Sequence, residues 1–159
     1  MSLTDDFKAA LGSWASGVSV VTTNAAGKLY GLTVSSFSSL SLAPPLILVC
    51  LNNENRLPTM ISEAEGFAVS ILSRTQETAS NYFARAGRPA TTEFTEIEGE
   101  WTSSGQPVIA GALATMVCEL REQIPQGDHT IVVGEVIQAT SGDGEPLIYY
   151  RRKYRSVTE

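Results

Sequence analysis

Two short segments about fifteen residues apart contain the residues best suited to binding a ligand. They are Gly31-Leu32-Thr33-Val34-Ser35-Ser36-Phe37 and Leu46-Ile47-Leu48-Val49-Cys50-Leu51-Asn52-Asn53. In an extended chain successive side chains face opposite ways, so Leu32 and Val34 share one face. Thr33 and Ser35 then share the other face, beside Gly31, which lets a flat or anionic group approach the backbone. This pattern predicts a pocket for a planar, phosphorylated ligand.

Side chains able to perform catalysis by themselves are scarce. The chain has one histidine, His129, and two cysteines, Cys50 and Cys118, too few for a zinc site or a disulfide framework. It also lacks a Gly-x-Gly-x-x-Gly turn, a phosphate loop and a Gly-x-Ser-x-Gly elbow. The reaction chemistry is therefore expected to come from a bound cofactor held by sheet edges and turns.

Each candidate residue also has a structural reading that the sequence leaves open. The hydroxyls of Thr33, Ser35 and Ser36 can bond a ligand ring or phosphate, yet Ser-Ser-Phe is also ordinary turn material. Cys50 ends an aliphatic run and can be inert packing. His129 follows Gly127-Asp128 in a turn before a strand, where a histidine can be merely exposed.

The polar residues after the second segment are candidates for a phosphate contact. Asn52, Asn55 and Arg56 lie where a helix begins, and backbone N–H groups point outward at such a position. The alternative is a capped helix without a ligand.

Composition limits the class of protein. The 159 residues fit one domain, 1–159, and a hydrophobic content of 43% with 18% charged residues is typical of a globular core. A net charge of −6 argues against nucleic acid and anionic membranes as partners. No apolar run reaches membrane-spanning length and the N-terminus lacks signal-peptide features, which predicts a cytoplasmic protein.

Hydrophobic periodicity and turn residues predict the elements. We expect three helices, over residues 5–14 with Thr4 as N-cap, 58–65 and 76–86. Strands are expected over 16–23, 29–37, 46–52, 67–72 and 146–150, with further strands within 107–140. A proline-rich linker is expected over 38–45 and a loop over 88–106. Six or seven strands joined mostly by hairpins do not alternate with helices as in a parallel sheet. The predicted fold is mainly β, an antiparallel barrel with about three flanking helices.

Five segments in order along the chain carry a family resemblance. They are Gly17–Thr23, Gly31–Phe37, Ser41–Leu46, Gly127–Val136 and Leu147–Arg151. Together they resemble the flavin reductases of two-component flavin-dependent monooxygenases. The resemblance implies a Greek-key, flavin-binding split barrel, a homodimer, and hydride transfer from NADH or NADPH to FMN or FAD, with reduced flavin supplied to a separate monooxygenase.

The resemblance also implies roles for individual residues. The flavin ring would be lined by Thr33, Val34, Ser35 and Ser36, and its ribityl side and ring edge by Cys50, Leu51 and Asn52. The phosphate would be approached by Asn55 and Arg56, and Phe83 would pack on the flavin. The nicotinamide would be seated by His129 and Tyr154. Glu54 departs from the hydroxyl residues often found in the phosphate turn. No side chain is expected to be catalytic in the hydride step, no metal is expected, and NADH is the expected reductant.

Two other classes stay open on sequence alone. One is a non-catalytic FMN-binding split-barrel protein with the same pocket but no nicotinamide site. The other is an all-β protein that binds no ligand. Neither FMN versus FAD nor prosthetic flavin versus diffusible flavin is decided by the residues.

Overall fold

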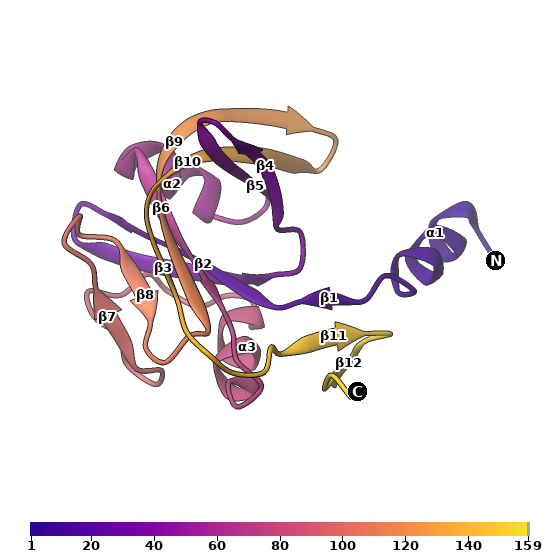
Figure 1. Ribbon diagram of the computed structural model, residues 1–159. Helices are drawn as coiled ribbons and strands as arrows, with labels where there is room; N and C mark the ends of the chain where they lie inside the picture. The colour runs from indigo at the N-terminus through magenta and orange to yellow at the C-terminus, as the bar shows by residue number, and fades with distance from the viewer. Residues whose placement is uncertain (159) are drawn as a thin grey trace.

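The computed structural model describes residues 1–158, so residue 159, the last of the predicted domain, lies outside the described part. Its helices are α1 (Leu3–Leu11), α2 (Leu57–Ala64) and α3 (Glu77–Ala84). Its strands are β1 (Ser16–Gly17), β2 (Ser19–Ala25), β3 (Lys28–Val34), β4 (Ser38–Leu42), β5 (Pro45–Asn52), β6 (Gly66–Ile71), β7 (Gly99–Trp101), β8 (Pro107–Ile109), β9 (Ala114–Gln126), β10 (His129–Ser141), β11 (Ile148–Tyr150) and β12 (Lys153–Arg155). Figure 1 shows their arrangement.

The body is a seven-stranded antiparallel sheet in the order β3-β2-β6-β9-β10-β5-β4. Small two- and three-stranded sheets, β7-β8 and β1-β11-β12, flank it. The predicted mainly β architecture with three helices is confirmed. Adjacent strands are joined by hairpins where the sequence offers turn residues: Ala26 and Gly27 both have positive φ, of 50° and 79°, in the β2–β3 turn.

The sheet curls into a split barrel, so that its edge strand β3 approaches β5 near the opposite edge. Just beyond the end of β3, the Ser36 Oγ accepts a hydrogen bond from the Cys50 N–H at 3.1 Å and donates one to the Cys50 carbonyl at 2.8 Å. This serine bridge continues the β4–β5 pairing, in which Ser38 lies opposite Leu48, and it holds the segment between β3 and β4 against β5. The gap beyond this bridge is the split.

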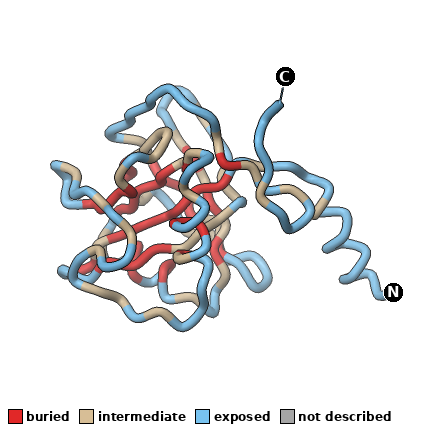
Figure 2. The backbone as a smooth tube through the Cα atoms, turned by 90° about the horizontal axis from the view of Figure 1, so that it is seen from below, coloured by how far each residue is buried: buried red, intermediate tan, exposed pale blue. Residues whose placement is uncertain are grey.

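The core fills the inside of this barrel, and buried backbone is concentrated in the body of the molecule (Figure 2). Phe67, Val69 and Val132 are fully buried there. Leu32 and Val34 pack against this cluster, as the alternation in β3 predicts.

The prediction that Gly31 lets a ligand approach the backbone is wrong. A Cβ at Gly31 would lie 2.9 Å from Thr22 Cγ2 and 3.1 Å from Phe83 Cδ1. Gly31 is itself buried, so its missing side chain makes room for protein neighbours and leaves no space for a ligand.

Helix α1 starts earlier than predicted and stands away from the body (Figure 1). Ser2, two residues before the expected N-cap Thr4, caps it: the Asp5 N–H bonds the Ser2 Oγ and the Asp5 carboxylate accepts from the Ser2 N–H. The helix ends at Leu11, and Trp14 lies beyond it. No residue of α1 is buried.

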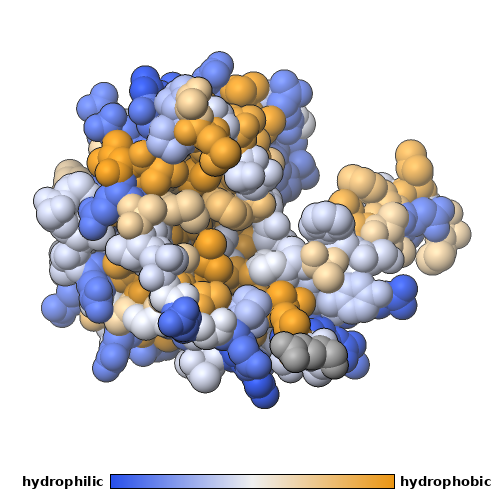
Figure 3. Space-filling view, viewed as in Figure 1, coloured by the Kyte–Doolittle hydropathy of each residue, from blue (hydrophilic) through white to orange (hydrophobic). Residues whose placement is uncertain are grey.

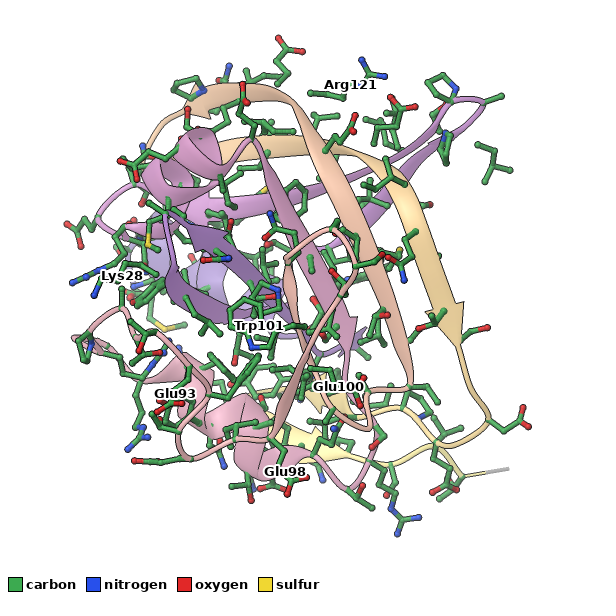
Figure 4. The ribbon with its side chains drawn as sticks, turned by 90° about the vertical axis from the view of Figure 1, so that its left-hand side faces the viewer. Lys28, Glu93, Glu98, Glu100, Trp101 and Arg121 are labelled. Carbon is green, nitrogen blue, oxygen red and sulfur yellow. The ribbon has the colours of Figure 1, made fainter. Side chains whose placement is uncertain are left out.

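Other boundaries also differ from the sequence expectations. The expected linker over 38–45 contains strand β4, which pairs with β5, and β7 interrupts the expected loop over 88–106. α2 and α3 fall where predicted within two residues, and β12 follows the expected last strand. Figure 4 shows the side of the body opposite α1, which carries the acidic Glu93, Glu98 and Glu100 as well as the basic Lys28 and Arg121.

Candidate functional site

A cavity of about 350 Å³ lies at the split of the barrel. Its lining comes from the end of β3, the end of β5, the last turn of α3 and the start of β10. The lining residues are Leu32, Thr33, Val34, Ser35, Ser36, Cys50, Leu51, Asn52, Asn55, Phe83, Ala84 and His129. The volume falls within the range of about 300–1,000 Å³ typical of small-molecule sites.

Strand pairing brings His129 to this cavity from a distant part of the chain. In the antiparallel register of β5 and β10, His129 lies opposite Asn52. The adjoining turn is fixed by the Asn53 N–H, which donates to the Asp128 carbonyl at 2.9 Å, and by the Thr130 hydroxyl, which donates to Asn53 Oδ1 at 2.6 Å. The predicted position of His129 at a strand mouth is therefore correct.

The three hydroxyls of the first segment are not equivalent. The Thr33 Oγ1 donates to the Ser80 carbonyl at 2.6 Å, which ties β3 to α3, and the Ser36 Oγ is engaged with Cys50. Among residues 1–158 the Ser35 hydroxyl has no hydrogen-bond partner, and Ser35 is exposed. Ser35 is therefore the hydroxyl most available to a ligand.

Backbone groups at the split provide further polar contacts. The Gly31 carbonyl accepts a hydrogen bond from Arg88 Nη2 at 2.5 Å, so it points away from β2. By the alternation of an antiparallel strand, the N–H and C=O of Thr33 point the same way, from the sheet's edge strand. Across the split, the outward-facing Asn52 carbonyl accepts from the Asn55 N–H at 3.1 Å. The backbone groups of Thr33 on the β3 wall are therefore available to a ligand, whereas the Asn52 carbonyl on the β5 wall is already hydrogen-bonded.

The His129 ring is held by its neighbour. Its Nδ1 lies 2.7 Å from Asp128 Oδ1, and the side chain is 46% exposed. The hydrogen bond to His129, and secondarily its charge, lower the pKa of Asp128 below the usual carboxyl value. Because this pKa is depressed, the stabilisation that the Asp128–His129 hydrogen bond contributes is complete above the ordinary carboxyl pKa. It is lost as the pH falls through the lowered pKa and Asp128 becomes protonated.

Tyr154 lies in a neighbouring cavity of about 170 Å³, also lined by Thr33, Val34 and Ser35. Its hydroxyl donates to Asn81 Oδ1 at 2.8 Å, and it lies 2.7 Å from the Ser80 Oγ. Because the single tyrosine proton goes to Asn81, Ser80 is the donor in the second bond. Tyr154 and His129 therefore lie in different cavities that share the wall formed by residues 33–35.

Arg56 does not line either cavity. Its guanidinium carbon lies 5.3 Å from the centroid of the Tyr30 ring, at the start of α2. Beside it, the Glu54 N–H bonds the Asn52 side-chain oxygen at 2.8 Å. Of the two residues expected near a phosphate, Asn55 lines the cavity and Arg56 lies over the Tyr30 ring outside that lining.

Sequence reasoning missed Ser80, Ala84 and Arg88. Ser80 is 1% exposed and joins Thr33 to Tyr154, while Arg88 anchors Gly31. Ala84 lines both cavities. A helix with one buried face was predictable, but which of its polar residues meets β3 depends on packing that the local sequence does not record.

Cys50 and Cys118 are both free thiols in different surroundings. Burial raises the pKa of Cys118 to about 12, so it stays protonated at neutral pH, whereas Cys50 is half-buried at the cavity. Within residues 1–158 no three His, Cys, Asp or Glu side chains are grouped to hold a metal ion. None of the helices in that part of the chain is long and apolar enough to cross a bilayer.

The fold and cavity define a split-barrel protein with a small-molecule site, and comparison with known proteins identifies the family. Residues 11–158 match the model of the flavin reductase like domain. The chain is 41% identical over 143 residues to the FMN reductase (NADH) SmoA of Agrobacterium fabrum, covering 90% of this chain and 80% of that protein. It is 40% identical over 152 residues to the reductase component of 4-hydroxyphenylacetate 3-monooxygenase from Thermus thermophilus, covering 95% of each.

A solved structure agrees with this relationship. The NADH:FAD oxidoreductase SgcE6 of Streptomyces globisporus, in complex with NAD and FAD fragments, matches with a TM-score of 0.91 at 32% identity, covering 98% of this chain and 93% of that one. The chain therefore belongs to the flavin reductase family, and the resemblance inferred from its five segments is confirmed.

Proposed function

We propose that this protein is an NADH-dependent flavin reductase that reduces FMN or FAD and supplies the reduced flavin to a separate monooxygenase. The names of its relatives support this activity: one is an FMN reductase using NADH and another is the reductase component of a monooxygenase. The structural observation that carries the proposal is the cavity at the split. It gathers all of the sequence-predicted site residues except Arg56 and Tyr154.

The cavity has the properties that a flavin ring requires. Leu32 offers apolar contact for a flat ring, and Thr33 on the edge strand presents backbone polar groups for the edge of that ring. Phe83 lines the same cavity but is only 2% exposed, so most of its ring packs in the core. Ser35 adds a free hydroxyl, and Asn55 lies on the side nearest the start of α2. These residues would hold the flavin without a charged side chain pressing on the ring.

The chain's own contribution to the reaction is to position two rings. A bound flavin supplies the acceptor for a hydride from the reduced nicotinamide. Residues 33–35 form a wall between the cavity that contains His129 and the cavity that contains Tyr154. A nicotinamide could therefore contact His129 on one side of this wall or Tyr154 on the other. No described side chain has to give up a proton, and alignment of the rings sets the rate.

Anaerobic mixing of the purified protein with NADH and FMN, and separately with FAD, tests the proposal. The visible absorbance band of the flavin should bleach at a rate that depends on protein concentration. Flavin binding without bleaching would instead support the non-catalytic flavin-binding module. Absence of both binding and bleaching would contradict the proposed function altogether.

We predict that His129→Ala raises the KM for NADH about three- to ten-fold, the loss of roughly one polar contact, and changes flavin affinity less. The ring lies at the cavity mouth and is fixed by Asp128, so its removal opens the nicotinamide side first. Steady-state kinetics with each substrate varied in turn measures both effects. A larger change in flavin affinity would place His129 against the flavin.

We further propose that the protein is a homodimer in which α1 packs on a second copy. Leu3, Phe7, Leu11 and Trp14 are 84%, 59%, 56% and 76% exposed. Figure 3 shows the apolar surface of α1 separated from the body. A helix with such a stripe is normally covered, and α1 stands away from the body, where a second copy can reach it (Figure 1).

Light scattering should give a mass twice that of the 17.0 kDa chain. The double variant Phe7→Asp/Leu11→Asp should shift the protein toward the monomer, while Lys8→Asp, on the same helix, should not. A wild-type protein that stays monomeric at micromolar concentration would overturn this proposal.

We also propose that residues 1–159 form one domain and that the protein works in the cytoplasm. The two free cysteines support a cytoplasmic location.

A further inference from the structure

Arg88 makes an unusually complete set of contacts with main-chain carbonyls. Its Nη2 donates to the Gly31 carbonyl at 2.5 Å and to the Phe83 carbonyl at 3.2 Å, and its Nε donates to the Arg85 carbonyl at 3.2 Å. The side chain is half-buried, and within residues 1–158 it has no carboxylate partner.

Aromatic rings surround the same guanidinium. The Arg88 carbon Cζ lies 5.1 Å from the ring centroids of Tyr30, Tyr82 and Phe83. Hydrogen bonds in the guanidinium plane and rings around it restrict both its position and its orientation. A lysine could supply the charge but could not reach three carbonyls with a planar group.

The contacts join two walls of the cavity. Gly31 belongs to β3 and lies two residues before Thr33, whereas Phe83 and Ala84 form the last turn of α3 and line the cavity. Carbonyl groups at the C-terminal end of α3 have no partner within the helix and need hydrogen-bond donors. Arg88 donates to these carbonyls and also to the Gly31 carbonyl of β3. One turn earlier on the same helix, the Thr33 hydroxyl bonds the Ser80 carbonyl.

We propose that Arg88 is a positioning residue for the flavin-reductase reaction: it fixes the end of α3 against the edge of β3 and so sets the distance between the Phe83–Ala84 wall and the Thr33–Ser36 wall. This inference rests on the proposed function. Arg88 acts through Phe83 and does not itself line the cavity.

The test compares Arg88→Ala and Arg88→Lys with a matched control, Arg85→Ala. Arg85 lies in the same segment and pairs with Glu96 at 2.9 Å, and its side chain is 56% exposed. KM and kcat are measured with FMN and with riboflavin, which has the same ring but no phosphate, at a temperature where circular dichroism shows each variant folded. Riboflavin separates an effect on the ring wall from an effect on phosphate.

We expect Arg88→Ala to raise KM about five- to ten-fold for both FMN and riboflavin, with a smaller change in kcat. Arg88→Lys should resemble Arg88→Ala, because charge alone does not restore the wall, and it serves as the test if the alanine variant does not fold. Arg85→Ala should behave as wild type.

Three results would overturn the inference: a KM increase confined to FMN, which would make Arg88 a phosphate contact; full rescue by lysine; or unchanged KM values in folded Arg88→Ala. Inactive wild type and Arg85→Ala would instead count against the proposed function, so the two failures are distinguishable.

Discussion

Replacing Ser35 with leucine is expected to raise the KM for flavin about 100-fold while the protein stays folded. Ser35 lines both the cavity at the split and the neighbouring cavity that holds Tyr154, and it is exposed just beyond the end of β3. A leucine there places three carbon atoms beyond Cβ, in place of one oxygen, in space that the flavin ring would need. The folded core loses no contact, because the Ser35 hydroxyl bonds no group within residues 1–158.

Two controls separate filling of the cavity from other effects. Ser35→Ala removes the hydroxyl without filling space and should change the KM for flavin only a few-fold. Ser38→Leu adds the same leucine to exposed β4, outside the cavities, and should leave flavin kinetics unchanged. Flavin titration and steady-state kinetics provide the measurement. An unchanged KM in folded Ser35→Leu would show that the ring binds elsewhere.

The second large effect concerns stability. Gly134→Ala is expected to lower the free energy of unfolding by about 3 kcal/mol. A Cβ at this position would lie 2.5 Å from Phe67 Cζ and 2.8 Å from Cys118 Cβ, and both side chains are buried in the core. Gly134 adjoins an irregularity in the β9–β10 ladder, but its φ is not positive, so the cost comes from packing.

Thermal or urea denaturation measures this cost, and Gly17→Ala is the matched control. A Cβ at Gly17 would meet no atom within 4 Å, so its stability should change by less than about 0.5 kcal/mol. Phe67→Leu should be destabilising alone but should offset part of the Gly134→Ala effect, because it frees the occupied space. Equal stability of the Gly134→Ala and Gly17→Ala variants would contradict the packing seen around Phe67.

Local patterns were enough to predict much of the fold and the location of the site. The alternation of Leu32 and Val34 with Thr33 and Ser35 identified the core face of β3 because a strand repeats every two residues. The Ala26-Gly27 turn was likewise predictable from its composition. The five segments in order then identified the flavin reductase family, which the comparisons confirm.

Contacts between distant segments were not predictable. Gly31 looked like an opening for a ligand, but whether a missing side chain faces solvent or Phe83 depends on where α3 packs. The bond from Thr33 to Ser80 spans 47 positions and that from Arg88 to Gly31 spans 57, with no local signal for either. The early start of α1 is a different failure, because Ser2 and Thr4 are both good caps and only Ser2 has Asp5 three residues on.

We propose that flavin binds in the split between β3 and β5. The most direct measurement is a crystal structure of the protein soaked or co-crystallised with FMN. The isoalloxazine ring is expected in the 350 Å³ cavity, in contact with residues 33–36 and 50–52. A flavin bound elsewhere, with those residues free of contact, would contradict it.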